Sequence, residues 1–153
     1  MKRALVLLLT APPALVQAAL VQAALAQTVT HTPPPHGAIY RAALPNVSFG
    51  VSVGQTDRLS AHRQAEAACR AAGAACTMVQ DFTLPCAAIA EGVVRTPGAL
   101  FMTSDRSTYR IRAITHGVAS NPADAGRLAL DACRPLDRGA LTCRVVTTQC
   151  GPR

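Results

Sequence analysis

The chain has 153 residues, of which 50% are hydrophobic, 15% are charged and only 3% are aromatic, and its formal net charge is +7. Nucleic-acid binding normally brings denser positive charge and stacking aromatic rings, so this composition argues against a nucleic-acid partner. The chain also has no Gly-rich phosphate loop and no G-x-S-x-G motif, and we expect no cofactor.

The N-terminus has the pattern of a signal peptide. Lys2 and Arg3 precede an apolar run, and Ala24-Leu25-Ala26 has the small-x-small form that signal peptidase cleaves. The sequence therefore predicts a signal peptide over 1–26, cleaved before Gln27, and a secreted or periplasmic protein without a membrane span. An uncleaved anchor is the alternative, because the apolar run approaches the thickness of a bilayer.

Residues 27–36 contain three consecutive prolines and predict a disordered, extended lead-in. His31 and His36 fall in this segment without a carboxylate or thiol beside them, so we predict no metal site there. The remainder, 37–153, is predicted to be a single disulfide-stabilised α+β domain.

The first half of this domain begins with a predicted β-hairpin. Apolar residues alternate with small polar ones over 47–53, which is typical of a half-buried strand, and 38–40 can form its partner. A helix is expected to begin at Asp57 or Ser60 and to end before Gly73. Its expected buried face consists of small residues: Ala61, Ala65, Ala68 and Cys69.

Another strand, predicted over 77–83, leads to the second half. There the strand candidates are 87–90, 100–102, 109–114 and 144–149. Asn121 and Pro122 predict the start of a second helix, as N-cap and first helical residue. Its expected buried face is again made mainly of small residues: Ala125, Leu128, Ala129, Ala132 and Cys133.

The two halves resemble each other. "AEAAC" at 65–69 matches "ALDAC" at 129–133, and each is followed by a loop, a second cysteine and a strand. We therefore predict an α+β fold with duplicated ββαβ-like units, at about 37–86 and 87–150. An antiparallel sheet would pack with two short Ala-rich helices.

Six cysteines in an exported chain predict three disulfides. Cys143 and Cys150 bracket one strand and would lie about 23 Å apart in an extended segment, too far to pair with each other. Fifteen connectivities are possible. In the favoured connectivity, Cys69–Cys76 and Cys133–Cys143 each tie the end of a helix to the next strand. The third pair, Cys86–Cys150, would then join the two halves.

The cysteine spacing favours neither a metal site nor redox chemistry. Structural zinc sites use cysteines two to four positions apart, and no such pair is present. A C-x-x-C redox motif is also absent.

Several segments of the chain match a known family pattern. They are Gly37-Ala-Ile-Tyr40, "SAHRQAEAAC", "CTMVQDFTLPCAAIAEG" and "GRLALDAC…CRVVTTQC", which together span about 37–150. With these segments the chain resembles the bacterial secreted domain-of-unknown-function family numbered 4189. The resemblance implies a small exported α+β domain with a duplicated helix–cysteine–strand unit. It supplies no catalytic residue, and the connection from Val93 to Ser107 looks expanded in this chain.

Few residues suggest catalysis. His62 and Glu66 lie four positions apart on the first predicted helix, where an acid–base pair is conceivable, but exposed pairs at this spacing are common. His116 follows a predicted strand beside Gly117 and resembles a turn residue. A small secreted hydrolase that uses these side chains is the alternative interpretation of the function.

The best functional cluster is made of arginines. Arg110 and Arg112 alternate along one predicted strand, with Arg106 and Tyr109 close to them in sequence. This face can dock an acidic protein or an anionic envelope polymer, whereas the opposing interpretation is an ordinary solvated sheet face.

These observations favour an exported, non-catalytic module that binds another protein, as an inhibitor, an immunity protein or a host-directed factor does. A structural component of the cell envelope is the third hypothesis. The sequence does not identify the partner.

Overall fold

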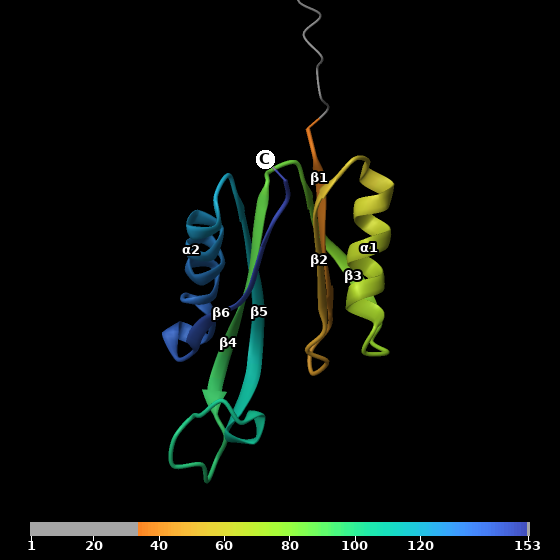
Figure 1. The fold of residues 1–153 in the computed structure, drawn as a ribbon. Helices are drawn as coiled ribbons and strands as arrows, with labels where there is room; N and C mark the ends of the chain where they lie inside the picture. Colours follow the sequence, from red (N-terminus) through yellow and green to blue (C-terminus); the bar gives the residue numbers. More distant parts are fainter. Residues whose placement is uncertain (1–33, 153) are drawn as a thin grey trace, which may run out of the picture. The chain divides into compact units, whose positions relative to one another are not determined.

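Two antiparallel three-stranded sheets, each with one helix, make up residues 34–152, the part of the chain that the computed structural model describes (Figure 1). The predicted signal peptide and most of the lead-in, with His31, therefore lie outside the described residues. None of the helices described is long and apolar enough to cross a membrane.

The two halves have the same topology. The first sheet has the strand order β2-β1-β3 and the second has the order β5-β4-β6. The elements in chain order are β1 (His36–Ala42), β2 (Phe49–Gln55), α1 (Arg58–Arg70), β3 (Cys76–Phe82), β4 (Cys86–Arg95), η1 (Arg106–Thr108), β5 (Tyr109–Ala119), α2 (Pro122–Cys133), η2 (Leu136–Gly139) and β6 (Thr142–Cys150). In each half the first strand is central, and the helix joins the two strands that flank it. The α+β class and the duplicated ββαβ units are confirmed, although the strands form two sheets instead of one.

Several local predictions need adjustment. β1 begins at His36, so the regular fold starts one residue inside the predicted lead-in. Residues 100–102 are not a strand but part of the loop between β4 and η1. Both helix caps form: Asp57 Oδ1 accepts from the Ser60 backbone N–H at 2.8 Å, and Asn121 Oδ1 accepts from that of Asp124 at 2.9 Å.

The main core lies between the two sheets. Its buried side chains come from both sheets: Ile39, Val51, Phe82, Ala87, Ile89 and Ile114. The outer face of each sheet packs against its own helix, with α1 on the first sheet and α2 on the second (Figure 1). β4, central in the second sheet, is therefore buried on both faces over most of its length.

Each helix lies unusually close to its sheet because the contacting residues are small. A Cβ on Gly50 of β2 would lie 2.6 Å from the Cys69 backbone nitrogen, and one on Gly117 of β5 would lie 2.5 Å from that of Ala129. Hydroxyl groups make direct bonds across the same gap. Ser52 Oγ donates to the Ala61 carbonyl, and Thr115 Oγ1 donates to the Ala129 carbonyl, both at 2.7 Å.

The helix faces differ in part from the prediction. α1 buries Ala61, Ala65 and Cys69, whereas Ala68 is exposed. α2 buries Ala125, Gly126, Ala129 and Cys133, whereas Leu128 and Ala132 are exposed. The buried face of each helix is therefore narrower than predicted. Leu128, the one large residue predicted on either face, is exposed.

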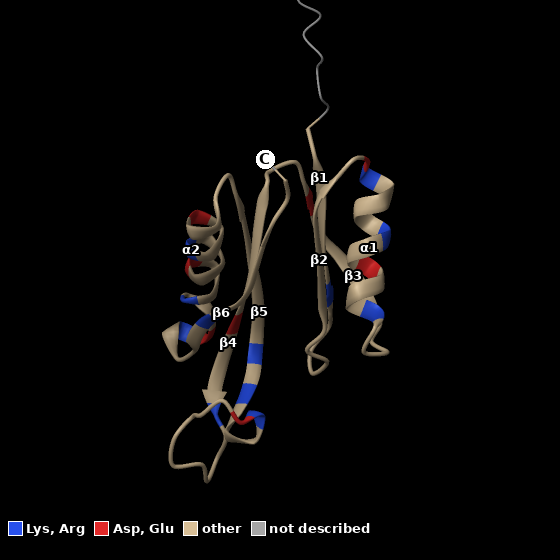
Figure 2. Cartoon of the chain, in the orientation of Figure 1, with Lys and Arg blue, Asp and Glu red and all other residues tan. Residues whose placement is uncertain are grey.

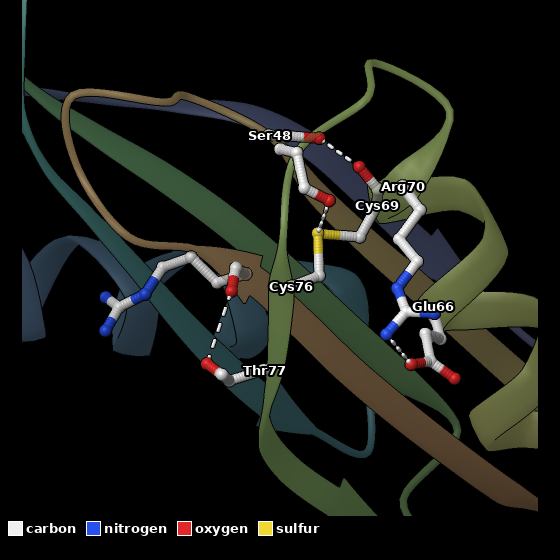
Figure 3. The surroundings of a disulfide bond; sticks show 8 residues. Ser48, Glu66, Cys69, Arg70, Cys76 and Thr77 are labelled. Carbon is white, nitrogen blue, oxygen red and sulfur yellow. Dashed lines mark hydrogen bonds and ion pairs between the residues drawn. A yellow bond between two sulfur atoms is a disulfide. The ribbon is translucent and has the colours of Figure 1, made fainter.

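Three disulfides contain all six cysteines, in the three pairs that the sequence favours. Cys69–Cys76 ties the end of α1 to the start of β3, and Cys133–Cys143 does the same for α2 and β6. Ser48 secures the first junction further, because its hydroxyl donates to the Cys69 carbonyl (Figure 3).

The role predicted for the third disulfide is wrong. Cys86 and Cys150 do not join the two halves: Cys86 opens β4, Cys150 closes β6, and the two residues are direct register partners in the second sheet. The prediction failed because it placed Cys86 at the end of the first unit, whereas that unit's last strand ends at Phe82.

The close helix–sheet contact generates a stability prediction. Gly117→Ala places a methyl group against the backbone of α2, and overpacking of this kind costs about 1–3 kcal/mol of the free energy of unfolding. Gly126→Ala is the matched control, because the nearest atom to its added Cβ is Val145 Cγ2 at 3.7 Å. There the better helix propensity of alanine stabilises by up to about 1 kcal/mol.

Urea unfolding of the disulfide-bonded protein measures both effects. Equal stability of Gly117→Ala and the unsubstituted protein would show that α2 does not press on β5 as described.

Candidate binding groove along the edge of β5

β5 is an edge strand, since it pairs with β4 alone, and the backbone groups on its other side have no strand partner among the described residues. Two adjoining hollows of about 440 and 350 Å³ follow this edge and share Arg112. The first hollow is lined by residues 112–115 of β5, by residues 41–44 at and just after the end of β1, and by Leu136 of η2. The second is bounded by Pro45 and Val47 from the β1–β2 connection. We call the two hollows together the β5 groove.

Four arginines line the β5 groove: Arg41, Arg106, Arg110 and Arg112. Arg110 and Arg112 are exposed, and neither forms an ion pair with any carboxylate of the described residues. Blue bands of basic residues follow one another on the lower part of β5 (Figure 2). The groove thus carries cationic groups whose charge is not neutralised locally.

Arg41 connects the first sheet to this edge. Its Nη1 donates to the Ile114 carbonyl of β5 at 2.6 Å. A planar guanidinium has five donors, so this bond leaves others free to bind an anion in the groove. Arg41 also forms no ion pair with a carboxylate of residues 34–152.

A buried carboxylate orders one end of the β5 groove. Glu91 of β4 is only 5% exposed, and its carboxylate lies 3.3 Å from Arg144 Nη2 of β6 and 3.7 Å from Arg106 Nη2. The Arg144 guanidinium also lies over the Tyr109 ring, 4.3 Å from its centroid. Hydrogen bonding to Tyr109 and Glu91 raises the pKa of Arg144 above its ordinary value. Arg106 and Tyr109 are thereby held beside the groove.

The four residues that the sequence predicts as a binding face come together in the structure, but they differ in exposure and in ion pairing. Arg106, Tyr109, Arg110 and Arg112 all line the second hollow. Arg110 and Arg112 are the accessible pair, whereas Tyr109 is buried and Arg106 is partly neutralised by Glu91. Sequence reasoning missed Arg41, Glu91 and Arg144. One available signal was Glu91, the single charged residue in the apolar run 86–94.

The proposed acid–base pair on α1 is not assembled. His62 Nδ1 lies 3.1 Å from the Tyr40 hydroxyl, and Arg58 Nε donates to His62 Nε2 at 3.4 Å. Glu66 instead forms an ion pair with Arg70 at 2.8 Å. Both nitrogens of His62 thus have partners other than Glu66.

His116 lies within β5 and not in a turn. It shares the strand face of Ile114 and Val118, which pack in the core between the sheets. Burial, and secondarily the positive charge of Arg41, lower the pKa of His116 below its usual 6.5. The neutral imidazole is therefore the favoured form in the folded protein.

Residues 34–152 contain no group of three or more His, Cys, Asp or Glu side chains placed to hold a metal ion. Free thiols are likewise absent from this part of the chain. The β5 groove presents guanidinium groups beside the unpaired backbone edge of β5.

The fold and groove define a small disulfide-stabilised domain of two ββαβ units with an open basic edge. Residues 36–150 match the family model described as Domain of unknown function (DUF4189), and the chain belongs to this family. No curated protein and no solved structure shows significant similarity to it.

The lowered pKa of His116 predicts how stability depends on pH. As the pH falls, the unfolded chain takes up a proton near 6.5, before the folded protein does. The contribution of His116 is therefore complete above pH 6.5 and is lost as the pH falls toward its lowered folded pKa. Replacing His116 by Gln should flatten the slope of unfolding free energy against pH in this window.

Urea unfolding at a series of pH values from about 7.5 to about 5 compares the two slopes. Parallel curves for His116→Gln and the unsubstituted protein would contradict the assignment.

Proposed function

We propose that this protein is an exported, non-catalytic binding module whose β5 groove takes an acidic, extended segment of another protein. The observation that carries the proposal is the placement of Arg110 and Arg112, without carboxylate partners among residues 34–152, on an unpaired sheet edge. Export is supported by the signal-peptide pattern of 1–26 and by three disulfides, which persist in oxidising compartments.

The unpaired edge of β5 suits an extended polypeptide. A peptide that adds as a strand satisfies the free backbone groups through main-chain hydrogen bonds, and alternate side chains reach the flanking pockets. In the β5 groove those pockets present guanidinium groups from Arg41, Arg110 and Arg112. Carboxylates on the incoming strand can pair with these guanidinium groups, and bidentate arginine–carboxylate bonds add specificity.

An edge protected by charge is the opposing explanation, since arginines also prevent edge strands from associating. That role requires no hollow beside the strand. The β5 groove is bounded by the β1–β2 connection and by Leu136 of η2, which supports a bound segment better than simple protection.

An anionic envelope polymer remains the competing ligand, because it would meet the same arginines. It would gain nothing from the unpaired backbone groups of β5, which a polypeptide can use. This difference separates the two ligands by experiment.

The proposal predicts selective binding of an acidic strand-forming peptide. We expect the folded protein to bind a labelled ten-residue peptide of alternating Glu and Thr, with affinity that falls as salt rises. Arg110→Ala/Arg112→Ala should weaken binding by about tenfold or more, because bonds to charged groups contribute about 1.5–3 kcal/mol each. Fluorescence anisotropy measures both.

The matched control is Arg63→Ala/Arg127→Ala, which removes the same charge from the two helices and should leave the affinity unchanged. Equal losses in the two double variants would show only general electrostatic attraction and would refute a groove. Inorganic polyphosphate that binds as tightly as the peptide would favour the envelope polymer.

A further inference from the structure

The loop between β4 and η1, residues 96–105, ends in an apolar tip that nothing in the described part of the chain covers. Leu100 is 81% exposed and Phe101 is 75% exposed, the two highest values among the exposed large hydrophobic residues described. We propose that this tip inserts into the headgroup region of an anionic lipid bilayer. The tip itself lies outside the β5 groove, since neither Leu100 nor Phe101 lines it.

The loop is ordered by its own hydrogen bonds. Arg95 Nη1 donates to the carbonyls of Ala99 at 2.8 Å and Leu100 at 3.1 Å. At the other side of the loop the Thr103 backbone N–H donates to Thr108 Oγ1 at 3.0 Å, and that hydroxyl donates to the Asp105 carbonyl at 2.7 Å. Polar groups on both sides of the tip are thus bonded within the loop, while the apolar side chains stay exposed.

This arrangement matters because an apolar tip that is already held exposed loses little conformational entropy on insertion. A flexible loop would bury Leu100 and Phe101 against its own protein, as most large apolar side chains are buried. Figure 1 shows the loop extending past the end of β4, clear of both helices.

The charges around the loop fit an anionic surface. Residues 93–112 contain four arginines and one acidic residue, Asp105. The Asp105 carboxylate keeps its negative charge and accepts from the backbone N–H of Ser107 at 2.9 Å and from its hydroxyl at 2.8 Å, so the arginines outnumber it. Arg95 and Arg110 lie at the base of the loop, where the β4–β5 pairing ends, and Arg110 also lines the β5 groove. Arg106 lies close by but is partly neutralised by Glu91.

A positive collar below an apolar tip combines the two attractions that bind proteins to membrane surfaces. Buried apolar area and attraction of basic residues to anionic lipids add, and each alone gives weak, reversible binding. A protein partner would need an apolar pocket beside an acidic surface, whereas an anionic bilayer offers an apolar interior beneath a negative surface. The collar therefore favours the lipid surface.

The absence of tryptophan from the sequence allows a direct test. Phe101→Trp introduces a single indole at the tip. Its fluorescence should shift to the blue on addition of vesicles of phosphatidylcholine with about 30% phosphatidylglycerol at low salt, and brominated lipids should quench it. Leu59→Trp, at an exposed position on α1, is the matched control and should not respond.

A second measurement separates insertion from surface attraction. Leu100→Ser/Phe101→Ser should reduce co-sedimentation with the same vesicles by about tenfold or more, because two apolar side chains are lost. Leu59→Ser should bind as the unsubstituted protein does. All three proteins should unfold at the same temperature, since the substituted residues are exposed.

The proposal is overturned if the indole fluorescence of the Phe101→Trp variant is the same with and without the anionic vesicles, or if co-sedimentation survives the double substitution. Loss of self-association in the double variant, without any vesicle binding, would also overturn it and would identify the tip as a contact between two copies of the chain.

Discussion

The close approach of each helix to its sheet is the constraint on which the rest of this structure depends. Gly50 and Gly117 leave no room for a side chain beneath α1 and α2, and the helices meet them with alanines. Such faces bury little apolar area, so the hydrophobic contribution from each helix is small. The disulfides at the helix ends, Cys69–Cys76 and Cys133–Cys143, tie each helix to the strand that follows it and restrict the unfolded chain.

The position of α2 on the outer face of the second sheet determines which side chains of β4 are buried and leaves β5 as an accessible edge. With β4 buried on both faces, a carboxylate can exist there only if it is paired, and Glu91 meets Arg144 and Arg106. β5 is left as an edge that carries Arg110 and Arg112 without carboxylate partners among the described residues. The basic groove is thus a direct consequence of the strand order.

Local signals in the sequence were sufficient for most of the fold. Alternation over 47–53, the caps at Asp57 and Asn121, and the repeated Ala-rich phrase predict elements through contacts between near neighbours. The Glu91–Arg144 contact joins residues 53 positions apart and depends on strand pairing, which local patterns do not encode. The same limit explains why the separation into two sheets, and with it the role of Cys86–Cys150, was missed. The segment 100–102 resembles a strand because its apolar residues are typical of a buried segment, although the tip is exposed.

We infer that the covalent ties contribute more than apolar burial to holding each helix on its sheet. Native-state hydrogen exchange of Cys133→Ser/Cys143→Ser tests this claim most directly, because exchange reports the stability of each element separately. We predict that the α2 amides lose protection while those of β4 stay protected, since α2 would then be held mainly by small residues and by the Thr115–Ala129 hydrogen bond. Equal protection of α2 and β4 in this variant would contradict the claim.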